Sequence, residues 1–306
     1  MTLKDKKNTQ LKKAVIKLIA FFDLFDYPLT SREVWRYLNQ GVDYQKVREV
    51  LKKGSGKIWA ERNGFYFLKD REEIVEIRRF RYNYARKKIL RARKLAKFFR
   101  YFPGVEMIAV SNIMGEYNLK KESDIDLLII AREGKIWSAR FYCVLVTKLL
   151  GLRPKPGKEE NKICLSFFLT PRGQNLEGLR LSRDVYFNYW MAGLEPVFNR
   201  NYAYENFIKA NRWLSEELPN WKLKKENWLT RERKILSFLV NLLAFEKLFK
   251  RIQLVFMNPE LKRKMNQDTC VVINDKILKL HTKDRREYYR EEFINKLAKY
   301  LKIYEA

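Results

Sequence analysis

The sequence has few of the residues on which several kinds of site depend. It contains one histidine, His281, and three cysteines, Cys143, Cys164 and Cys270, in 306 residues. One histidine argues against multi-histidine metal sites and histidine-based triads. Three widely spaced cysteines support neither a disulfide framework nor a zinc cluster, and they fit a reducing compartment. We therefore expect a cytoplasmic protein in which His281 is structural.

Long apolar runs and acidic side chains are also scarce. The longest nearly continuous apolar stretch, residues 235–245, is too short to cross a bilayer. No small-residue cleavage site follows the lysine-rich N-terminal segment. Asp and Glu number 36 against 64 Lys and Arg, which gives a net charge of +28. We expect no membrane contact and a polyanionic partner, nucleic acid first.

The positive charge is unevenly distributed along the chain. Residues 1–102 carry 27 basic and 11 acidic side chains, 103–220 carry 16 and 14, and 221–306 carry 21 and 11. A nearly neutral middle between two basic flanks indicates separate structural units. Together with changes in hydrophobic pattern, it divides the chain into residues 1–71, 72–102, 103–219 and 220–306.

Residues 1–71 carry the signals of three short helices and a hairpin. Apolar residues recur at helical spacing over 12–26, and Thr30 and Glu33 form the Thr-x-x-Glu capping box of a second helix. Asn63-Gly64 lies between two short apolar runs, which indicates a hairpin. This order is typical of a winged helix-turn-helix, a fold that binds either nucleic acid or another protein.

Residues 72–102 are expected to form one long basic helix. From Arg78 to Arg100 the chain has 11 Lys and Arg and no Asp or Glu. A stripe of apolar residues at steps of four and three can pack while the rest is cationic: Ala85, Ile89, Ala92, Ala96 and Phe99. Because no acidic residue offsets the repulsion among these cations, the helix is expected to contact nucleic-acid phosphates. Such contacts bind nucleic acid without recognising its base sequence. The candidate nucleic-acid-binding residues are Arg78, Arg79, Arg81, Arg86, Lys87, Arg91 and Lys94.

The remaining two regions differ in their patterns. Residues 103–219 mix strand and helix signals, with strands expected at 105–110, 125–131 and 163–169 and helices at 134–150, about 183–193 and about 203–217. Residues 220–306 are expected to be mainly helical, with a long apolar helix near 229–256, a hairpin near 271–278 and a last helix from about 283. The whole chain is therefore expected to be an α+β protein.

The residues that carry chemistry lie at the start of the second of these strands. Asp124 and Asp126 are two residues apart, so both carboxylates point to one face of the strand. Adjacent carboxylates repel each other, and a divalent cation relieves that repulsion. Mg²⁺ takes one or two carboxylates and fills its other positions with waters and substrate phosphates. The sequence therefore predicts a Mg²⁺ or Mn²⁺ site.

This stretch resembles the DNA polymerase β-type nucleotidyltransferase superfamily, whose pattern is Gly-Ser, a short helix, and then Asp-hydrophobic-Asp on the next strand. Ser111 matches the serine, Gly115 matches a small residue after it, and Asp124 and Asp126 match the catalytic, metal-binding pair. The resemblance implies that the turn at Ser111 and Asn112 holds the phosphates of a nucleoside triphosphate. The layout as a whole is similar to that of prokaryotic nucleotidyltransferase-domain proteins with an N-terminal winged helix.

Two positions depart from the superfamily pattern. Val110 stands where glycine is usual, and its side chain hinders close approach of a triphosphate to the backbone. A third carboxylate is expected on a later strand and is not evident at 162–169. That strand offers only Ser166 or Cys164 at the position, and the substitutes to consider are Glu177 and Asp184. If none serves, the core either holds a single metal or is inactive.

Other motifs are less informative. Gly54-Ser55-Gly56-Lys57 lacks the spacing of a P-loop and is interpreted as the turn into the hairpin. Arg153, Lys155 and Lys158 either reach a triphosphate or form a solvated loop. An aromatic cluster at helical spacing either stacks a base or, more commonly, belongs to the core: Tyr186, Phe187, Tyr189 and Trp190.

The sequence thus supports two hypotheses. The first is a cytoplasmic, metal-dependent nucleotidyltransferase that moves a nucleoside monophosphate from a triphosphate to a hydroxyl acceptor such as RNA or DNA, and releases pyrophosphate. The second is a non-catalytic winged-helix nucleic-acid-binding protein with a degenerate transferase core. Neither the base transferred nor the acceptor is specified by the sequence.

Overall fold

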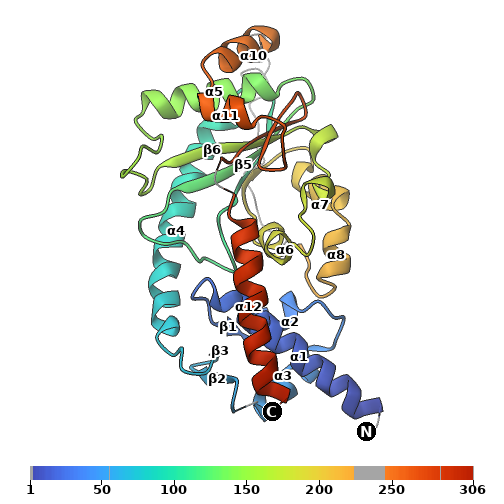
Figure 1. The fold of residues 1–306 in the computed structure, drawn as a ribbon. Helices are drawn as coiled ribbons and strands as arrows, with labels where there is room; N and C mark the ends of the chain where they lie inside the picture. Colours follow the sequence, from blue (N-terminus) through green and yellow to red (C-terminus); the bar gives the residue numbers. More distant parts are fainter. Residues whose placement is uncertain (1–2, 55, 224–244, 283, 306) are drawn as a thin grey trace.

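The structure, a computed structural model, is an α+β fold that describes residues 3–54, 56–223, 245–282 and 284–305. Figure 1 shows a large sheet at one end of an elongated molecule and the N-terminal elements at the other, with two long helices, α4 and α12, running between them. Among these residues, no helix combines the length and apolarity needed to span a bilayer.

The N-terminal part contains three helices and a three-stranded antiparallel sheet of order β1-β3-β2. Its elements are α1 (Leu3–Asp23), β1 (Leu29–Thr30), α2 (Ser31–Tyr37), α3 (Tyr44–Lys53), β2 (Trp59–Arg62) and β3 (Phe65–Leu68). The capping box of α2 is confirmed, because the Thr30 hydroxyl accepts from the Glu33 N–H at 3.2 Å and the Glu33 carboxylate accepts from the Thr30 N–H at 2.8 Å. The hairpin at Asn63-Gly64 is also confirmed, and both residues have positive φ.

The long basic helix expected from the sequence is α4 (Ile74–Phe99). Its apolar stripe packs against β4 and β7 of the large sheet, and every member of the stripe is buried. One basic residue, Lys88, lies on the same face and is 1% exposed. The helix therefore turns its stripe and Lys88 inward and most of its other cations to solvent.

The large sheet has six strands in the order β7-β4-β5-β6-β9-β8. They are β4 (Val105–Val110), β5 (Ile125–Ala131), β6 (Ile163–Leu169), β7 (Glu195–Asn199), β8 (Val271–Ile273) and β9 (Ile277–Leu280). Neighbouring strands are antiparallel except β5 and β6, which are parallel and joined through α5 (Ile136–Leu149). The three strands expected from the sequence are confirmed, and β7 is an additional edge strand. The expected hairpin is β8–β9, which extends the sheet beyond β6.

Alternation along β5 separates the two faces of the sheet. Ile125, Leu127 and Ile129 pack with α4, α5 and α10 (Glu246–Val255). Leu128 and Ile130 face the other way, toward α6 (Val185–Ala192) and the N-terminal part. Because side chains alternate along β5, Asp126 lies on this second face, at the end of the row that contains Leu128 and Ile130.

The remaining helices are α7 (Ala203–Ala210), α8 (Trp213–Glu217), α11 (Pro259–Lys264) and α12 (Arg286–Glu305). Apolar residues of α7, α8 and α12 pack in the core of the second face, whereas α11 lies beside α5 and α10 and packs with the first face. The single helix expected at about 203–217 is two helices, and the Asn211 side chain between them bonds the carbonyls of Phe207 and Gln174. Of the helix expected near 229–256, residues 229–244 lie outside the described residues. Helix α12 packs along α1, where Lys296 forms an ion pair with Asp23.

Candidate functional site

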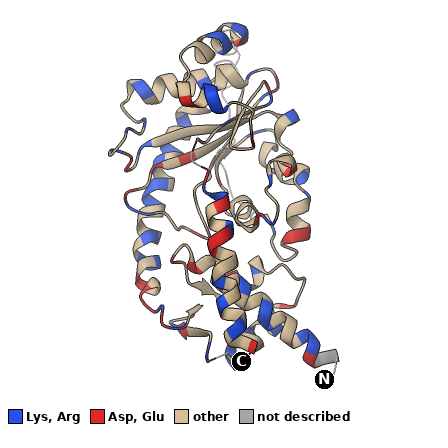
Figure 2. Ribbon diagram, viewed as in Figure 1, with Lys and Arg blue, Asp and Glu red and all other residues tan. Residues whose placement is uncertain are grey.

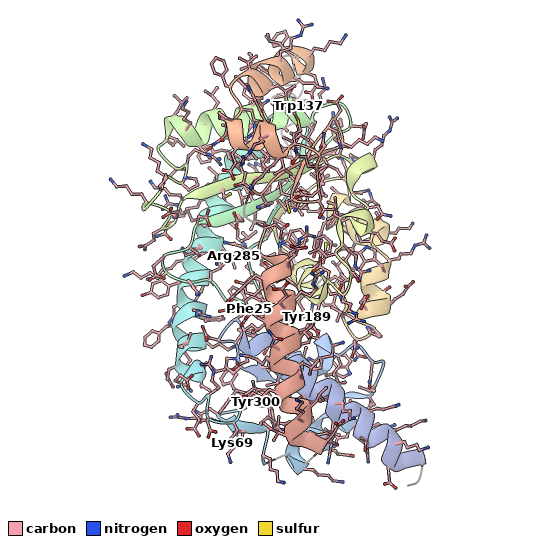
Figure 3. All side chains as sticks on the ribbon, in the orientation of Figure 1. Phe25, Lys69, Trp137, Tyr189, Arg285 and Tyr300 are labelled. Atoms are coloured by element: carbon pink, nitrogen blue, oxygen red, sulfur yellow. The ribbon has the colours of Figure 1, made fainter. Side chains whose placement is uncertain are left out.

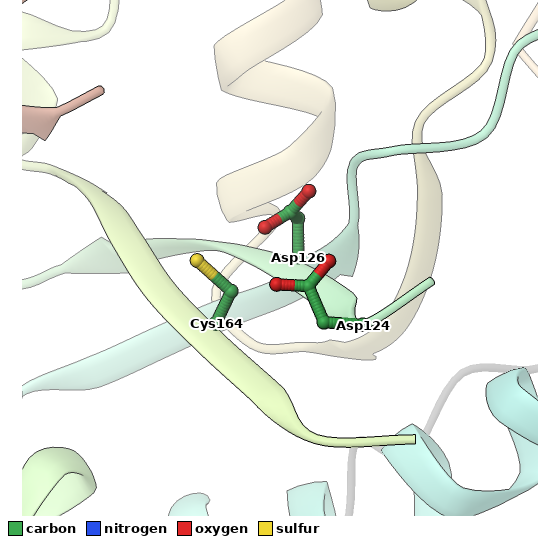
Figure 4. A group of neighbouring side chains, drawn as sticks. All are labelled: Asp124, Asp126 and Cys164. Carbon is green, nitrogen blue, oxygen red and sulfur yellow. The ribbon is translucent and has the colours of Figure 1, made fainter. Parts of the chain in front are cut away.

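Asp124 and Asp126 converge with Cys164 at the edge where β5 and β6 begin. One ligand atom of each side chain lies within 4.8 Å of the others, and Asp126 and Cys164 are direct partners across the parallel strand pair. Figure 4 shows both carboxyl groups on one side of the sheet, with the Cys164 sulfur beside them. Within the described part of the chain, these three form the one group of acidic, cysteine or histidine side chains close enough to hold a metal ion.

The electrostatics of the pair are unfavourable without a counter-charge. Burial, and then the charge of Asp124, raises the pKa of Asp126 to about 7. Burial also raises the pKa of Asp124, although its own backbone N–H and Lys88 oppose that rise. Burial and the neighbouring Asp126 raise the pKa of the Cys164 thiol well above its usual value. A bound cation would favour the charged form of all three groups.

The two other residues considered as a third acid lie elsewhere. Asp184 is buried and caps α6 by accepting from the Phe187 N–H at 3.0 Å, and it forms an ion pair with Arg286 at 3.3 Å. Glu177 is exposed in a short 3₁₀ turn. The structure thus brings Cys164, and neither of these acids, to the aspartate pair.

Ser111 and Asn112 lie beside the aspartates, directly after β4. The Ser111 N–H and hydroxyl donate to the main-chain oxygen of Asp126 at 2.9 and 3.3 Å. The Asn112 amide donates to the main-chain oxygen of Asp124 at 3.0 Å, while its Oδ1 is buried without a hydrogen-bond partner. Val110 pairs within the sheet with Leu127 and Glu195. These bonds tie the turn after β4 to the backbone of both aspartates.

Gly115 lies apart from that turn, against the N-terminal part. It has a φ of +85°, and a Cβ there would lie 2.5 Å from the ring of Tyr27. The Tyr27 hydroxyl accepts from the N–H of Glu116 at 2.8 Å. The small residue of the motif therefore gives Tyr27 room to pack, and it does not line the pocket beside Asp126.

A pocket of about 230 Å³ opens beside Asp126, with Ser111 and Asn112 on the same wall. Its other lining residues come from β6, α6, the end of β9 and the start of α12: Phe167, Tyr186, Phe187, Trp190, Lys279, His281, Asp284, Arg285, Arg286 and Tyr289. The C-terminal segment therefore supplies one whole wall of the pocket. Nothing in the local sequence around the aspartates indicated this wall, because it lies about 150 residues further along the chain.

Most of the charged side chains on the C-terminal wall of the pocket are buried in ion pairs, whereas Arg285 is exposed. Lys279 and Arg286 are buried, and both bond Asp284, at 2.9 Å for the Lys279 Nζ. Burial would raise the pKa of Asp284, but its bonds to Arg286 and Lys279 hold it well below the usual range. Arg285 is exposed at the sheet end of α12 (Figure 3) and lines the pocket. It is the cation on this wall best placed to meet a soluble anion.

Aromatic rings form the side of the pocket between α6 and α12. The rings of Tyr186 and Tyr289 stack at 5.3 Å with an interplanar angle of 3°. Trp190 stacks on Phe187 at 5.2 Å and on Phe167 at 5.9 Å. Tyr189, the remaining member of the cluster, is buried against Phe21 and Phe22. The cluster is thus divided: Tyr189 belongs to the core, and the other three line the pocket.

His281 belongs to a short hydrogen-bonded chain that ends at Cys164. Its Nε2 lies 3.2 Å from the Ser166 Oγ, and the Cys164 Sγ donates to the same oxygen at 3.4 Å. Burial, with Lys279 nearby, lowers the pKa of His281 to about 4. The ring is therefore neutral at physiological pH, and it lies in the wall of the pocket.

Lys88 supports the loop that leads to the aspartates. Its Nζ donates to the main-chain oxygens of Lys121 (2.9 Å) and Ser123. Burial lowers the pKa of Lys88, and nearby carboxylates such as Asp124 oppose that shift. A lysine in the register of the apolar stripe, three residues after Ala85, was the sequence signal for this role.

The basic residues of the loop after α5 have different surroundings. The Arg153 guanidinium donates to the main-chain oxygen of Ile163 at 3.0 Å, and burial lowers its pKa while Cys164 and the two aspartates oppose that shift. Lys155 and Lys158 are exposed and pair through their backbones. Arg153 therefore lies near the aspartates as a partly buried cation.

The candidate nucleic-acid-binding residues of α4 also have different surroundings. Arg78 is bonded to Glu33 at 2.7 Å, and Arg81 to Asp26 at 2.8 Å, so both fasten α4 to the N-terminal part. Arg79 pairs with Glu76 at 2.7 Å at the surface. The other four are exposed: Arg86, Lys87, Arg91 and Lys94. Figure 2 shows the resulting band of basic residues along α4.

Comparisons with known proteins identify no relative: no family model matches the chain, and no curated protein or solved structure matches it either. The function is therefore inferred from the residues and their geometry.

Proposed function

We propose that this protein is a divalent-metal-dependent nucleotidyltransferase of the cytoplasm, which transfers a nucleoside monophosphate from a triphosphate to a hydroxyl acceptor. The observation that carries the proposal is the convergence of Asp124 and Asp126 at the sheet edge, beside a pocket lined by Asp126, Ser111, Asn112 and Arg285. Two carboxylates that can hold a metal, beside an exposed guanidinium that can pair with phosphate oxygens, suit phosphoryl transfer through a metal.

The donor set fits one divalent cation. Carboxylate oxygens are the ligands that Mg²⁺ and Mn²⁺ take in proteins, and two buried, mutually repelling carboxylates are stabilised by such a charge. When bound, the cation supplies charge neutralisation and orientation to the transferring phosphate. Asp124 and Asp126 would hold it.

The other residues of the pocket would position the nucleotide. Arg285 would pair with phosphate oxygens, because a guanidinium binds them through two donors at once. The Asn112 Oδ1, buried without a partner, is an acceptor for a hydroxyl or amino group of the ligand. The Tyr186 and Tyr289 rings offer a flat face for a base. Because about 230 Å³ is less than the roughly 300–1,000 Å³ usual for small-ligand sites, a triphosphate would extend past the mouth.

The N-terminal part supports a nucleic-acid acceptor. The order α1-β1-α2-α3-β2-β3 with a three-stranded antiparallel sheet is that of a winged helix-turn-helix. The helix in the recognition position, α3, exposes Lys46, Arg48, Lys52 and Lys53. The exposed cations of α4 add a band of basic residues along that helix. RNA and DNA share the phosphate chemistry that such a surface recognises.

A labelling assay tests the activity. The protein is incubated with each α-³²P-labelled nucleoside triphosphate, Mg²⁺ or Mn²⁺, and RNA, DNA or a protein fraction as acceptor. We expect label in one acceptor with one equivalent of pyrophosphate released. The variant Asp124→Asn/Asp126→Asn should fall to background, while Glu122→Gln, an exposed carboxylate two residues away, should retain activity.

The second hypothesis, a nucleic-acid-binding protein with a degenerate core, is favoured by one observation. A cysteine stands beside the aspartates where the superfamily pattern has a third carboxylate. This hypothesis predicts salt-sensitive nucleic-acid binding with no label in any acceptor. The absence of labelling for every triphosphate and acceptor, in a protein that binds nucleic acid, would favour it over the transferase.

A further inference from the structure

Cys164 lies beside the two aspartates, where its sulfur can act as a metal ligand. It faces Asp126 across the parallel strand pair, and its Sγ lies within 4.8 Å of one carboxylate oxygen of each aspartate. Its sulfur is on the same side of the sheet as both carboxyl groups (Figure 4). The group therefore offers two hard oxygen donors and one soft sulfur donor to a single ion.

We infer that Cys164 is a ligand of the cation that Asp124 and Asp126 hold, and that it makes the site prefer a divalent transition metal with affinity for sulfur, such as Zn²⁺, over Mg²⁺. The inference rests on the proposed function only for the presence of a cation at the aspartate pair. Thiolate sulfur is a ligand for transition metals, whereas Mg²⁺ is bound through oxygen. Metal preference therefore follows from the third donor.

Ser166 and His281 form a hydrogen-bonded chain next to the sulfur. Ser166 Oγ accepts from the Cys164 thiol at 3.4 Å and lies 3.2 Å from the His281 Nε2. A serine hydroxyl and a neutral imidazole can each donate and accept, so the same chain can turn to donate toward a thiolate. The thiol proton is released to solvent as the metal–sulfur bond forms. Such outer partners orient metal ligands and tune their affinity.

The remaining cysteines have no such surroundings. Cys143 is fully buried in the core on α5, and Cys270 precedes β8. Neither belongs to a group of metal-ligating side chains in the described part of the chain. Cys270→Ser is therefore a matched control that removes a partly buried thiol outside the metal-ligating group.

Metal binding to the full chain, in a non-thiol reductant, tests the inference without turnover. Cd²⁺ is the optical probe, because a cadmium–sulfur bond gives a charge-transfer band in the ultraviolet. Mn²⁺ binding is measured by the loss of the electron paramagnetic resonance signal of free Mn²⁺, and Mg²⁺ binding by competition with Mn²⁺. We expect a Cd²⁺ band in the native protein and in Cys270→Ser, and no band in Cys164→Ser.

Replacing Cys164 should change the affinity for each cation according to whether that cation prefers sulfur or oxygen ligands. Loss of the sulfur ligand should weaken Cd²⁺ binding by about tenfold or more, since removal of even an outer partner has an effect of that size. Cys164→Asp should strengthen Mn²⁺ and Mg²⁺ binding relative to Cd²⁺, because these cations prefer oxygen ligands, which also shows that the site is folded.

Two results would overturn the inference, and they have different consequences. If Cd²⁺ binds without a charge-transfer band and Cys164→Ser binds as tightly as the native protein, Cys164 is not a ligand, and the proposed transferase activity stands. If no divalent cation binds even in the presence of nucleoside triphosphate, both the inference and the metal-dependent transferase are wrong.

Discussion

The Nζ of Lys88 donates a hydrogen bond to the main-chain oxygen of Lys121, 2.9 Å away and three residues before Asp124. Through this bond and a second to Ser123, the basic helix α4 holds the loop from which both aspartates follow. The long helix thus has two faces with different roles. One fixes the candidate site from within, and the other presents exposed cations to solvent.

Replacing Lys88 with methionine tests the inner role. The change keeps the length of the side chain but leaves two main-chain oxygens without their donor, which costs about 1–3 kcal/mol of unfolding free energy. We expect that loss in urea denaturation, and weaker cation binding at Asp124. Lys87→Met, the exposed neighbour, should change neither. Unaltered stability and cation binding in Lys88→Met would show that the loop holds its shape without the lysine.

His281 predicts a specific dependence of stability on pH. Its pKa falls from the usual 6.5 to about 4 because of burial, so between these values the unfolded chain binds a proton that the folded chain does not. Stability should therefore fall as the pH is lowered from 6.5 to 4, by up to about 3 kcal/mol for this group. His281→Gln should flatten that part of the profile.

The same residue can be observed directly by NMR. Because the chain has one histidine, its imidazole signal is assigned without ambiguity. We expect the signal to titrate near pH 4, and a midpoint close to 6.5 would mean that the ring is exposed to water and that the hydrogen-bonded chain to Cys164 is not formed.

Gly115 should be needed for packing. An alanine there places a Cβ 2.5 Å from the Tyr27 ring at a φ of +85°, whereas Gly134, with a φ of +67°, has nothing within 4 Å of such a Cβ. Both substitutions carry the cost of a left-handed backbone, and Gly115→Ala alone adds overpacking, about 1–3 kcal/mol. Thermal unfolding of the two variants measures the difference. Equal losses in both would contradict the close approach to Tyr27.

The outer cations of α4 should act on nucleic-acid affinity and its salt dependence. Replacing Arg86, Lys87, Arg91 and Lys94 with alanine should weaken binding at low salt and reduce the slope of log affinity against log salt by up to about 3. Arg78→Ala should instead destabilise the fold by about 3–5 kcal/mol, since it leaves the buried Glu33 carboxylate without its cationic partner. An unchanged salt slope in the fourfold variant would exclude this face of α4 as the binding surface.

Local patterns were enough to predict much of the fold. The strands β4, β5 and β6 are apolar runs, the capping box fixes the start of α2, and Asn63-Gly64 fixes the N-terminal hairpin. Strand β7 was missed because it contains Pro196, and proline is tolerated only at a sheet edge or an irregularity. Both conditions hold here, since β7 is the edge strand and its register with β4 shifts next to Ala109.

The candidate site was only partly predictable, for a physical reason. Asp124 and Asp126 are neighbours along one strand, so strand alternation alone puts their carboxylates together. Arg285 and Tyr289 reach the same pocket because the β8–β9 hairpin adds to the edge of β6 and the chain then enters α12, which runs from the sheet toward the N-terminal part. Such long-range closure depends on tertiary packing, which no local pattern encodes.

The most direct test of the account is calorimetric binding of a non-hydrolysable nucleoside triphosphate to the full chain, with and without Mn²⁺. In the native protein we predict that nucleotide binding requires the cation. In Asp126→Asn most of the nucleotide affinity should be lost, and the remaining binding should no longer depend on the cation. In Arg285→Ala the nucleotide affinity should fall by about tenfold or more. Arg290→Ala, one turn further along α12 and outside the pocket lining, should bind as the native protein does. Nucleotide binding that is equally tight in all four proteins and indifferent to the cation would contradict the account.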